Sequence, residues 1–293
     1  MIIGLRLGSV YALVALGYTM VYGIIRLINF AHGDFIMVGG YTLYFTIPIL
    51  LHQIGLPAWV GVLAAIVICA LVGVAVELVA YRPVRKKGTS MSALITAIAM
   101  SLLLENLAQA IPAMGPNPRV ISEEIFSTAP ISIGGVSTNL ASIMTILIAA
   151  VVMAALQLFV QKTKLGRAMR AVSENKEAST LVGINVNRTI VTTFAIGSGL
   201  AAVAALMYCA QYHTVTTTMG SMLGLKAFVA AVLGGIGLIP GAMLGGIVVG
   251  IIEALVTAYI SSSLANAVVF LVLIVVLLVK PAGILGKNVG EKV

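Results

Sequence analysis

Residues 57–80 read PAWVGVLAAIVICALVGVAVELVA, an apolar stretch whose one charged side chain is Glu77. An α-helix rises about 1.5 Å per residue, so about 20 apolar residues cross the ~30 Å hydrocarbon layer of a bilayer. The whole chain has the same character, with 60% hydrophobic and 9% charged residues against roughly 25% charged in soluble domains. The composition excludes a soluble globular protein and indicates a polytopic membrane protein.

Further apolar runs flank this stretch on both sides. They predict an all-α transmembrane helical bundle of about eight segments, forming one domain over residues 1–293. The expected segments are residues 5–25, 35–51, 57–80, 91–111, 141–160, 189–208, 227–259 and 264–279. A closed β-barrel is excluded because its strands alternate apolar and polar residues. Cys69 and Cys209 lie in different runs and are expected to be small core residues.

The basic residues between the runs predict the orientation, because cytoplasmic loops carry an excess of Lys and Arg. Loops 81–88 and 161–188 are both rich in bases and are expected in the cytoplasm. Loop 112–140 has Arg119 against Glu123 and Glu124, and it is the expected outer loop. The bases of the tail, also expected inside, are Lys280, Lys287 and Lys292. The net charge of +8 thus reports topology, since no basic stripe of the kind that follows nucleic-acid phosphates is present.

The run at 227–259 is long for one span and short for two. It predicts a broken or re-entrant segment, with the break near residues 234–241, and leaves open whether the chain crosses twice. The residues that mark the break are Gly234, Gly235, Gly237, Pro240 and Gly241. Beyond it, Gly246 and Gly250 have the four-residue spacing that lets helices approach closely. No Lys-Ser/Thr follows the glycines, so they do not predict a nucleotide-binding loop.

The segment Asn29-Phe30-Ala31-His32-Gly33-Asp34-Phe35 interrupts the apolar sequence between the first two runs, and Asp34 is the only aspartate in the chain. Two interpretations have equal weight. One is a connector in which Asp34 caps the following helix. The other is a polar element on a transport path, in which Asn, His and Asp side chains organise an irregular backbone.

Three glutamates fall within or near apolar runs, where a carboxylate is costly and function is the first hypothesis. Glu77 lies close to Arg82 and is expected to reach toward the membrane interface. Glu105 belongs to a possible buried polar patch with Asn106 and Gln109, and Glu253 is followed by Thr257 four residues later. A proton relay requires these carboxylates to face one another.

The long basic loop reads KLGRAMRAVSENKEASTLVGIN over residues 164–185. Its small and apolar residues predict a helix over about 167–181 that ends at Gly183 as a C-cap. Such a helix either lies on anionic lipid or inserts into a groove of a partner protein. The sequence of the loop leaves both possibilities open.

Three motifs carry a resemblance to a known family. The loop from Gly166 to Asn185 resembles the EAA-type coupling loop of ABC importer permeases. The stretches NFAHGD at 29–34 and AAVLGGIG at 230–237, with PGA at 240–242, look like motifs of the branched-chain amino acid permease family. The motifs lie near both ends and in the middle, so the resemblance covers essentially the whole chain, and it is greatest to the first, H-type permease of the family.

The resemblance implies a non-catalytic permease subunit in the bacterial cytoplasmic (inner) membrane. The implied partners are a second, related permease, two cytoplasmic ABC ATPases that use ATP and Mg, and a periplasmic or lipid-anchored amino acid binding protein. The chain itself is expected to hold no cofactor or metal. The candidate substrate-path residues are Asn29, His32, Gly33, Asp34, Glu105, Gly234, Gly235 and Gly237. The candidate ATPase-coupling residues are Gly166, Arg167, Ala168, Arg170, Ala171, Glu174, Asn175, Ala178 and Gly183.

The expected function is ATP-driven import of leucine, isoleucine and valine by alternating access. Urea and short-amide permeases share these motifs, so a related substrate is one alternative. The other alternative is an ion-coupled secondary carrier built on Glu77, Glu105 and Glu253, although it leaves the long basic loop unexplained.

Overall fold

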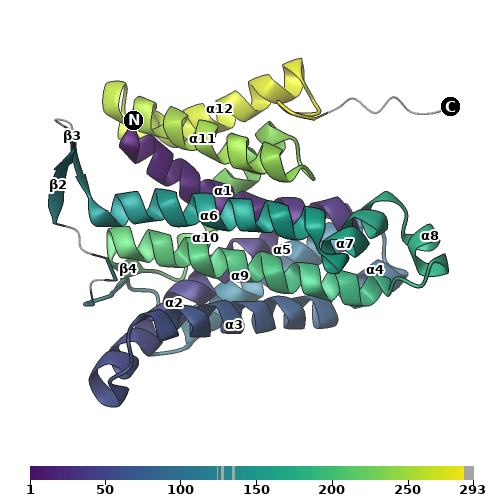
Figure 1. Ribbon diagram of the computed structural model, residues 1–293, viewed down its shortest axis with the longest axis horizontal. Helices are drawn as coiled ribbons and strands as arrows, with labels where there is room; N and C mark the ends of the chain where they lie inside the picture. Colours follow the sequence, from purple (N-terminus) through teal and green to yellow (C-terminus); the bar gives the residue numbers. More distant parts are fainter. Residues whose placement is uncertain (124, 127–128, 134–135, 287–293) are drawn as a thin grey trace.

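The computed structural model describes residues 1–123, 125–126, 129–133 and 136–286 (Figure 1). Within this part of the chain, 8 helices are long and apolar enough to cross a membrane, which confirms the predicted all-α membrane bundle. The elements of the first half are α1 (Ile2–Ile25), η1 (Phe30–His32), α2 (Asp34–Pro48), η2 (Ile49–Ile54), α3 (Trp59–Val76), η3 (Glu77–Tyr81), α4 (Arg82–Lys87) and α5 (Ser90–Ala110). Those of the second half are α6 (Leu140–Lys162), α7 (Lys164–Glu174), α8 (Lys176–Leu181), α9 (Val186–Tyr212), α10 (Met219–Gly234), α11 (Ile239–Tyr259) and α12 (Ser262–Val279).

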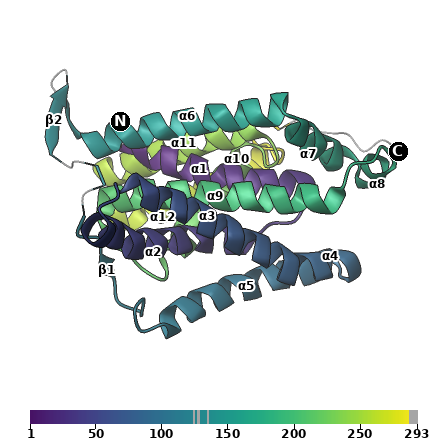
Figure 2. The same ribbon diagram turned by 60° about the horizontal axis from the view of Figure 1, so that its bottom comes forward.

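The helix α1 is the centre of the bundle. In the most apolar 18-residue stretch of each helix, 89% of the residues are buried in α1 and 67% in α9, against 17% in α5 and 11% in α12. Figures 1 and 2 show α1 enclosed by α6, α9, α10 and α11, and Figure 2 shows α4 and α5 at one edge. Because lipid is as apolar as a protein core, the outer helices keep their exposed leucines and valines facing the membrane.

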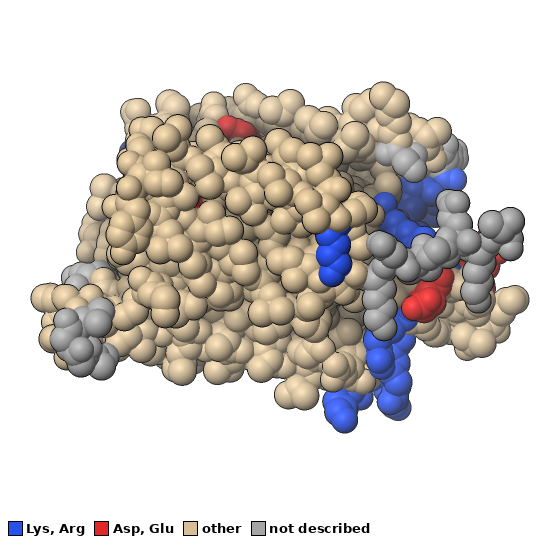
Figure 3. Space-filling view, turned by 90° about the horizontal axis from the view of Figure 1, so that it is seen from above, with Lys and Arg blue, Asp and Glu red and all other residues tan. Residues whose placement is uncertain are grey.

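The two ends of the bundle differ in charge. One end, called here the basic end, carries α4, α7 and α8, and the described chain finishes there (Figure 1). Figure 3 shows Lys and Arg gathered toward that end beside a wide surface with few charged side chains. The predicted outer-loop residue Glu124 and tail residues Lys287 and Lys292 lie outside the described residues.

The opposite end, called here the strand end, carries the N-terminus and two small antiparallel strand pairs (Figure 1). In one pair β1 (Arg119–Val120) meets β4 (Thr214–Val215), with Arg119 opposite Val215. In the other, β2 (Pro130–Ile133) pairs with β3 (Val136–Asn139). These short pairs are additions to the predicted all-α fold, in which β4 contacts α2 and β3 contacts α6.

The predicted break in the run at 227–259 is confirmed and is a turn between two helices. The helix α10 begins earlier than the run, at Met219, and α11 returns beside it. A Cβ on Gly234 would meet Gly241, and a Cβ on Gly245 would meet Ala230, so α10 and α11 are antiparallel and closely packed. The chain therefore passes through the bundle three times after the strand end at β4, along α10, α11 and α12, and ends at the basic end.

Candidate functional site

The connector between α1 and α2 is buried. After Arg26, which ends α1 in a left-handed conformation with φ 58°, the chain turns back into the bundle. Asn29, His32 and Asp34 are each 1% exposed. Asp34 stands in the first turn of α2 and Gly33 is the N-cap, so of the two interpretations the one in which Asp34 caps the helix is wrong. A carboxylate in the first turn still interacts favourably with the helix dipole.

The imidazole of His32 is packed among aromatic rings. Its centroid lies 4.8 Å from that of Tyr18 and 5.8 Å from that of Phe35. A Cβ at Gly17 would collide with the ring, so glycine there makes room for it. Asn29 is fixed in a similar way, because the hydroxyl of Tyr81 donates a 2.8 Å hydrogen bond to its Oδ1. Both side chains hold the connector against α1 and η3.

A polar cavity of about 220 Å³ lies beside this connector, between α1, the start of α2, α5 and α10. Gly33, Asp34 and Glu105 line it, together with Ser101 and Ser221. The Ser221 hydroxyl donates a 3.5 Å hydrogen bond to Glu105. The structure thus brings together three of the predicted path residues from distant parts of the sequence, while Asn29 and His32 are buried next to the cavity and do not line it.

The predicted path glycines Gly234, Gly235 and Gly237 lie elsewhere, in the turn at the basic end. Gly235 and Gly237 have φ values of +105° and +94°, which only glycine adopts without strain. The segment after α12 closes over the turn, where the amides of Ile284 and Leu285 donate to the carbonyls of Leu233 and Gly234 at 2.8 and 3.2 Å. These bonds satisfy acceptors that the end of α10 would otherwise leave unpaired.

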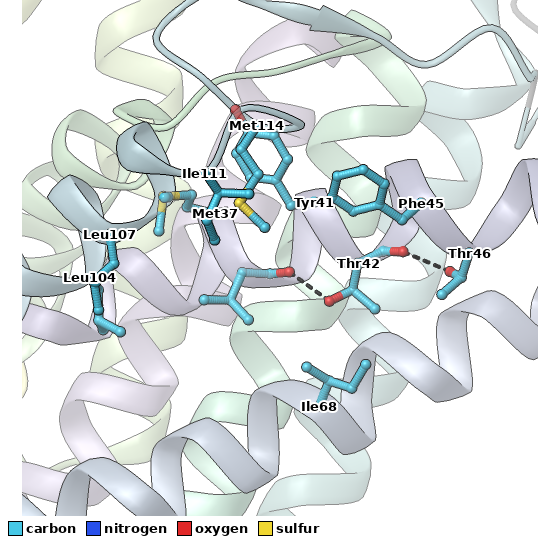
Figure 4. Close-up of a pocket in the computed structure, with 12 residues that line it drawn as sticks. Met37, Tyr41, Thr42, Phe45, Thr46, Ile68, Leu104, Leu107, Ile111 and Met114 are labelled. Atoms are coloured by element: carbon cyan, nitrogen blue, oxygen red, sulfur yellow. Dashed lines mark hydrogen bonds between the residues drawn. The ribbon is translucent and has the colours of Figure 1, made fainter.

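A second cavity, of about 330 Å³, is almost wholly apolar (Figure 4). It lies between α2, α3 and α5, and Met37, Phe45 and Leu107 are among its lining residues. The Thr42 and Thr46 hydroxyls donate 2.7 Å bonds to carbonyls of their own helix, as Figure 4 shows. With its threonines so occupied, this cavity offers no charged group to the ends of an amino acid.

The intramembrane glutamates Glu77 and Glu253 are both paired with bases. Glu77 is fully buried and contacts Arg85 at 2.8 Å and Arg82 at 3.2 Å, so the prediction that it reaches to the interface is wrong. Its carboxylate is held inward because two arginines approach it from the next turns of the same helical segment. Glu253 contacts Lys226 of α10 at 2.7 Å.

Lys226 is not among the residues predicted from the sequence, although it is a lone base at the edge of the 227–259 run. From the sequence, Lys226 could be noticed only by its place at the start of an apolar run, and hydropathy assigns such a residue to the boundary of a span. The structure places it inside the bundle, 7% exposed.

The coupling loop forms two short helices and not the single helix predicted over about 167–181. Side-chain oxygens cap successive helices: Thr163 accepts from the amide of Gly166, and Asn175 from that of Ala178, at 3.0 and 2.9 Å. Asn175 has extended backbone geometry and therefore separates α7 from α8. The C-cap of α8 is Val182, and the predicted Gly183 is the next residue, where its φ of +84° turns the chain out of the helix.

The helix α7 is amphipathic. Gly166, Met169 and Val172 are buried against the bundle, and at Gly166 a Cβ would meet the carbonyls of Phe159 and Val160. The predicted coupling residues with outward side chains are Arg167, Arg170, Glu174, Asn175 and Ala178, whereas Ala168 and Ala171 are half-buried. A small cavity of about 70 Å³ joins α7 to the glycine turn, with Arg170 and Gly237 in its lining. The helix α7 packs directly against α1, α6 and α9.

The helix α8 projects from the basic end with an apolar tip. Leu181 is 89% exposed and Val182 is 75% exposed. At the start of α8, burial followed by repulsion from Arg85 and Arg26 lowers the pKa of Lys176 from its ordinary value. An exposed apolar tip beside bases is suited to insertion into a partner surface.

Comparison with known proteins agrees with this architecture. A family model described as "Branched-chain amino acid transport system / permease component" matches residues 1–277. The chain is 42% identical over 302 residues to the high-affinity branched-chain amino acid transport system permease protein BraD of Pseudomonas aeruginosa, covering 99% of this chain and 96% of that protein. It is 43% identical over 303 residues to the corresponding protein LivH of Escherichia coli (strain K12), with the same coverage. No solved structure matches the chain.

Proposed function

The chain belongs to the permease family of branched-chain amino acid transport systems, and from that premise we propose that it forms one half of the translocation path of an ATP-driven importer of leucine, isoleucine and valine. The single observation that carries the proposal is the near full-length similarity to BraD and LivH, whose names state this transport. Urea or short-amide transport stays an alternative that substrate competition tests.

The orientation follows from charge. Bases accumulate on the cytoplasmic side of membrane proteins, so we place the basic end in the cytoplasm of a bacterial inner membrane. The strand end and the N-terminus then face the periplasm, where a binding protein would deliver the amino acid. On this orientation α7 and α8 are available to cytoplasmic ATPases.

The coupling surface is proposed on α7 and α8. The apolar tip at Leu181 and Val182 is exposed, while the buried side of α7 contacts α1 and α9. ATP-driven closure of two ATPases would move this short helical pair as a rigid body, and α7 would transmit the movement to α1 and the α10–α11 turn. The chain itself would hydrolyse nothing, and ATP and Mg would be bound by the partners.

The proposed path includes the polar cavity at Gly33, Asp34 and Glu105. Part of its lining comes from α5, which Figure 2 shows at one edge of the bundle, so a second permease on that side would enclose it. Its carboxyl and hydroxyl groups suit the ammonium group of an amino acid. Its lining contains no Lys or Arg to receive the carboxylate.

The proposal is tested by purifying tagged protein from its native membrane and measuring ATP hydrolysis with and without leucine and the periplasmic fraction. We expect two ATPase subunits and a second permease to co-purify, with hydrolysis stimulated only when leucine and a binding protein are both present. A lone chain that drives leucine uptake into liposomes under a proton or sodium gradient would show a secondary carrier instead.

A further inference from the structure

The largest cavity described at the strand end carries both a positive and a negative charge. It measures about 900 Å³ and lies between α1, α9, α10 and α11, on the side of α10 opposite the Asp34 cavity. Lys226 and Glu253 are in its wall, and their side chains taken alone are 9% and 13% exposed. The residues near its mouth include Met1 and Tyr259, so it opens toward the end that we assign to the periplasm.

The two charges form a triad with Tyr11 of α1. Lys226 Nζ lies 2.7 Å from Glu253 Oε1, and the Tyr11 hydroxyl donates a 2.8 Å hydrogen bond to Glu253 Oε2. Lys226 Nζ also lies 3.5 Å from the Tyr11 oxygen. An ammonium has three protons, and a carboxylate accepts about four hydrogen bonds. Each partner therefore keeps capacity for a further bond to a molecule in the cavity.

Stability alone does not account for this ion pair. Removing two charges from water costs several kcal/mol per ion, and apolar residues of similar volume often replace such pairs without loss. Charged residues inside membrane segments are accordingly a functional hypothesis by default. Here the pair borders a cavity and is not enclosed on all sides, so a ligand can reach it.

The rest of the cavity wall has a hydroxyl-bearing part and an apolar part. Hydroxyl groups come from Thr218 and Thr257, and an apolar part comes from Met222, Leu223 and Leu255. A molecule with adjacent positive and negative groups on one carbon and an aliphatic side chain matches these surfaces. A ligand of that kind brings no net charge to the neutral pair, whereas a simple amine or acid adds an uncompensated charge in a region of low dielectric.

We propose that this cavity recognises the zwitterionic head of an α-amino acid, with Lys226 receiving its carboxylate, Glu253 receiving its ammonium and the Met222–Leu223 wall receiving its aliphatic side chain. The inference rests on the proposed import function and assigns head-group recognition to a site distinct from the Asp34 cavity. Tyr11 positions the Glu253 carboxylate for this contact. Free leucine is the probe for both tests below.

The first test measures ATP-driven leucine uptake by the reconstituted transporter, with its binding protein, carrying Lys226→Met, Glu253→Gln or both. We expect each single variant and the double variant to lose uptake about tenfold or more, as for loss of a hydrogen bond to a charged group. Stimulation of hydrolysis by the loaded binding protein should persist. Glu123→Gln is the matched control, since Glu123 is also paired, with His52 at 2.7 Å, but lies outside the cavity lining.

The double variant separates recognition from structure. If the double variant Lys226→Met with Glu253→Gln restores native uptake, the ion pair is structural and the inference is wrong. Normal uptake by both single variants would also overturn the inference. Absence of ATP-driven leucine uptake by the native complex would instead count against the proposed function, so the two failures are distinguishable.

A second measurement keeps the native charges in case the variants do not assemble. Thr257→Cys places a thiol in the cavity wall, while the native Cys69 and Cys209 are fully buried. We expect leucine to slow modification of this thiol several-fold more than isoamylamine or 4-methylpentanoate, which each keep one charge. Equal protection by all three compounds, or none by leucine, overturns zwitterion recognition.

Discussion

At the residue scale, α1 and α11 can approach closely because the glycines at their contact have no Cβ atom. A Cβ at Gly8 would lie 2.7 Å from Ile247 Cα, and one at Gly250 would collide with the backbone of Gly8. In a membrane no hydrophobic force drives helices together, so their association relies on close packing, which small residues allow. The four-residue spacing of Gly246 and Gly250 in the sequence anticipated this contact, and the structure supplies its partner, α1.

Gly8→Ala should lower the stability of the bundle. The added methyl group meets backbone that cannot move independently, so we expect a loss of about 1–3 kcal/mol, typical of overpacking. The melting temperature in detergent measures it. Gly199→Ala is the control, since its Cβ would lie an ordinary 3.5 Å from Ile66 Cγ2. Equal melting temperatures for the two variants would contradict the close packing of α1 and α11.

Glu77→Gln should destabilise the basic end. It removes the negative partner of Arg82 and Arg85, whose side chains are 30% and 15% exposed. Because water still reaches both arginines, the expected loss is below the about 3–5 kcal/mol that breaking a fully buried pair costs. Thermal unfolding of the purified variant measures the loss. An unchanged melting temperature would show that the Glu77 ion pairs contribute nothing to stability.

At the scale of elements, the segment that follows α6 is divided by its own capping residues. Thr163, Asn175 and Asn185 each accept a hydrogen bond from an amide three residues later, and each begins a new helix. The hydrophobic pattern alone predicted one helix over about 167–181. That pattern does not reveal that Asn175, within the segment, caps a second helix. The division leaves α8 as a small projection whose tip is free for a partner.

Gly183→Ala should impair coupling more than stability. The position has φ +84° and no atom within 4 Å of an added Cβ, so the change acts through backbone strain of about 1–2 kcal/mol. Gly55→Ala is matched to it, with φ +73° and the same open surroundings at the other end. We expect leucine uptake to fall only for Gly183→Ala. Similar uptake by both variants would remove α8 from the proposed coupling surface.

At the scale of the whole molecule, the alternation of helices fixes both ends of the chain. Starting from the strand end, α1 reaches the basic end, and the described C-terminal segment closes at the basic end after α12 (Figure 1). On the proposed orientation, which follows the positive-inside bias, the strand end faces the periplasm. The triad of Tyr11, Lys226 and Glu253 lines the cavity at this end.

Cysteine labelling in cells tests this topology. Ser137 of β3 and Glu177 of α8 are both exposed, at opposite ends. A membrane-impermeant maleimide should label Ser137→Cys in intact spheroplasts and Glu177→Cys only after permeabilisation. The parent chain should remain unlabelled in either case, because Cys69 and Cys209 are buried. Labelling of Glu177→Cys in intact spheroplasts would reverse the assigned orientation.

The sequence alone determined the membrane class, the positions of most spans, the break after Gly234, the buried cysteines and the basic loops. Each of these features depends on hydropathy, charge or glycine content summed over consecutive residues, which the sequence gives directly. It also placed Asp34 and Glu105 among the functional candidates, because polar side chains within or beside apolar runs are conspicuous, and Gly33 as part of the NFAHGD motif.

Only the tertiary structure decided which of these residues meet. Lys226 and Glu253 come from different helices, Glu77 is turned inward by Arg82 and Arg85, and the glycine turn lies at the basic end away from the Asp34 cavity. The physical reason is that lipid-facing and core-facing surfaces are both apolar here, so no amphipathic pattern reveals which side of a helix faces its neighbours. Pairing between helices then depends on packing of the whole bundle.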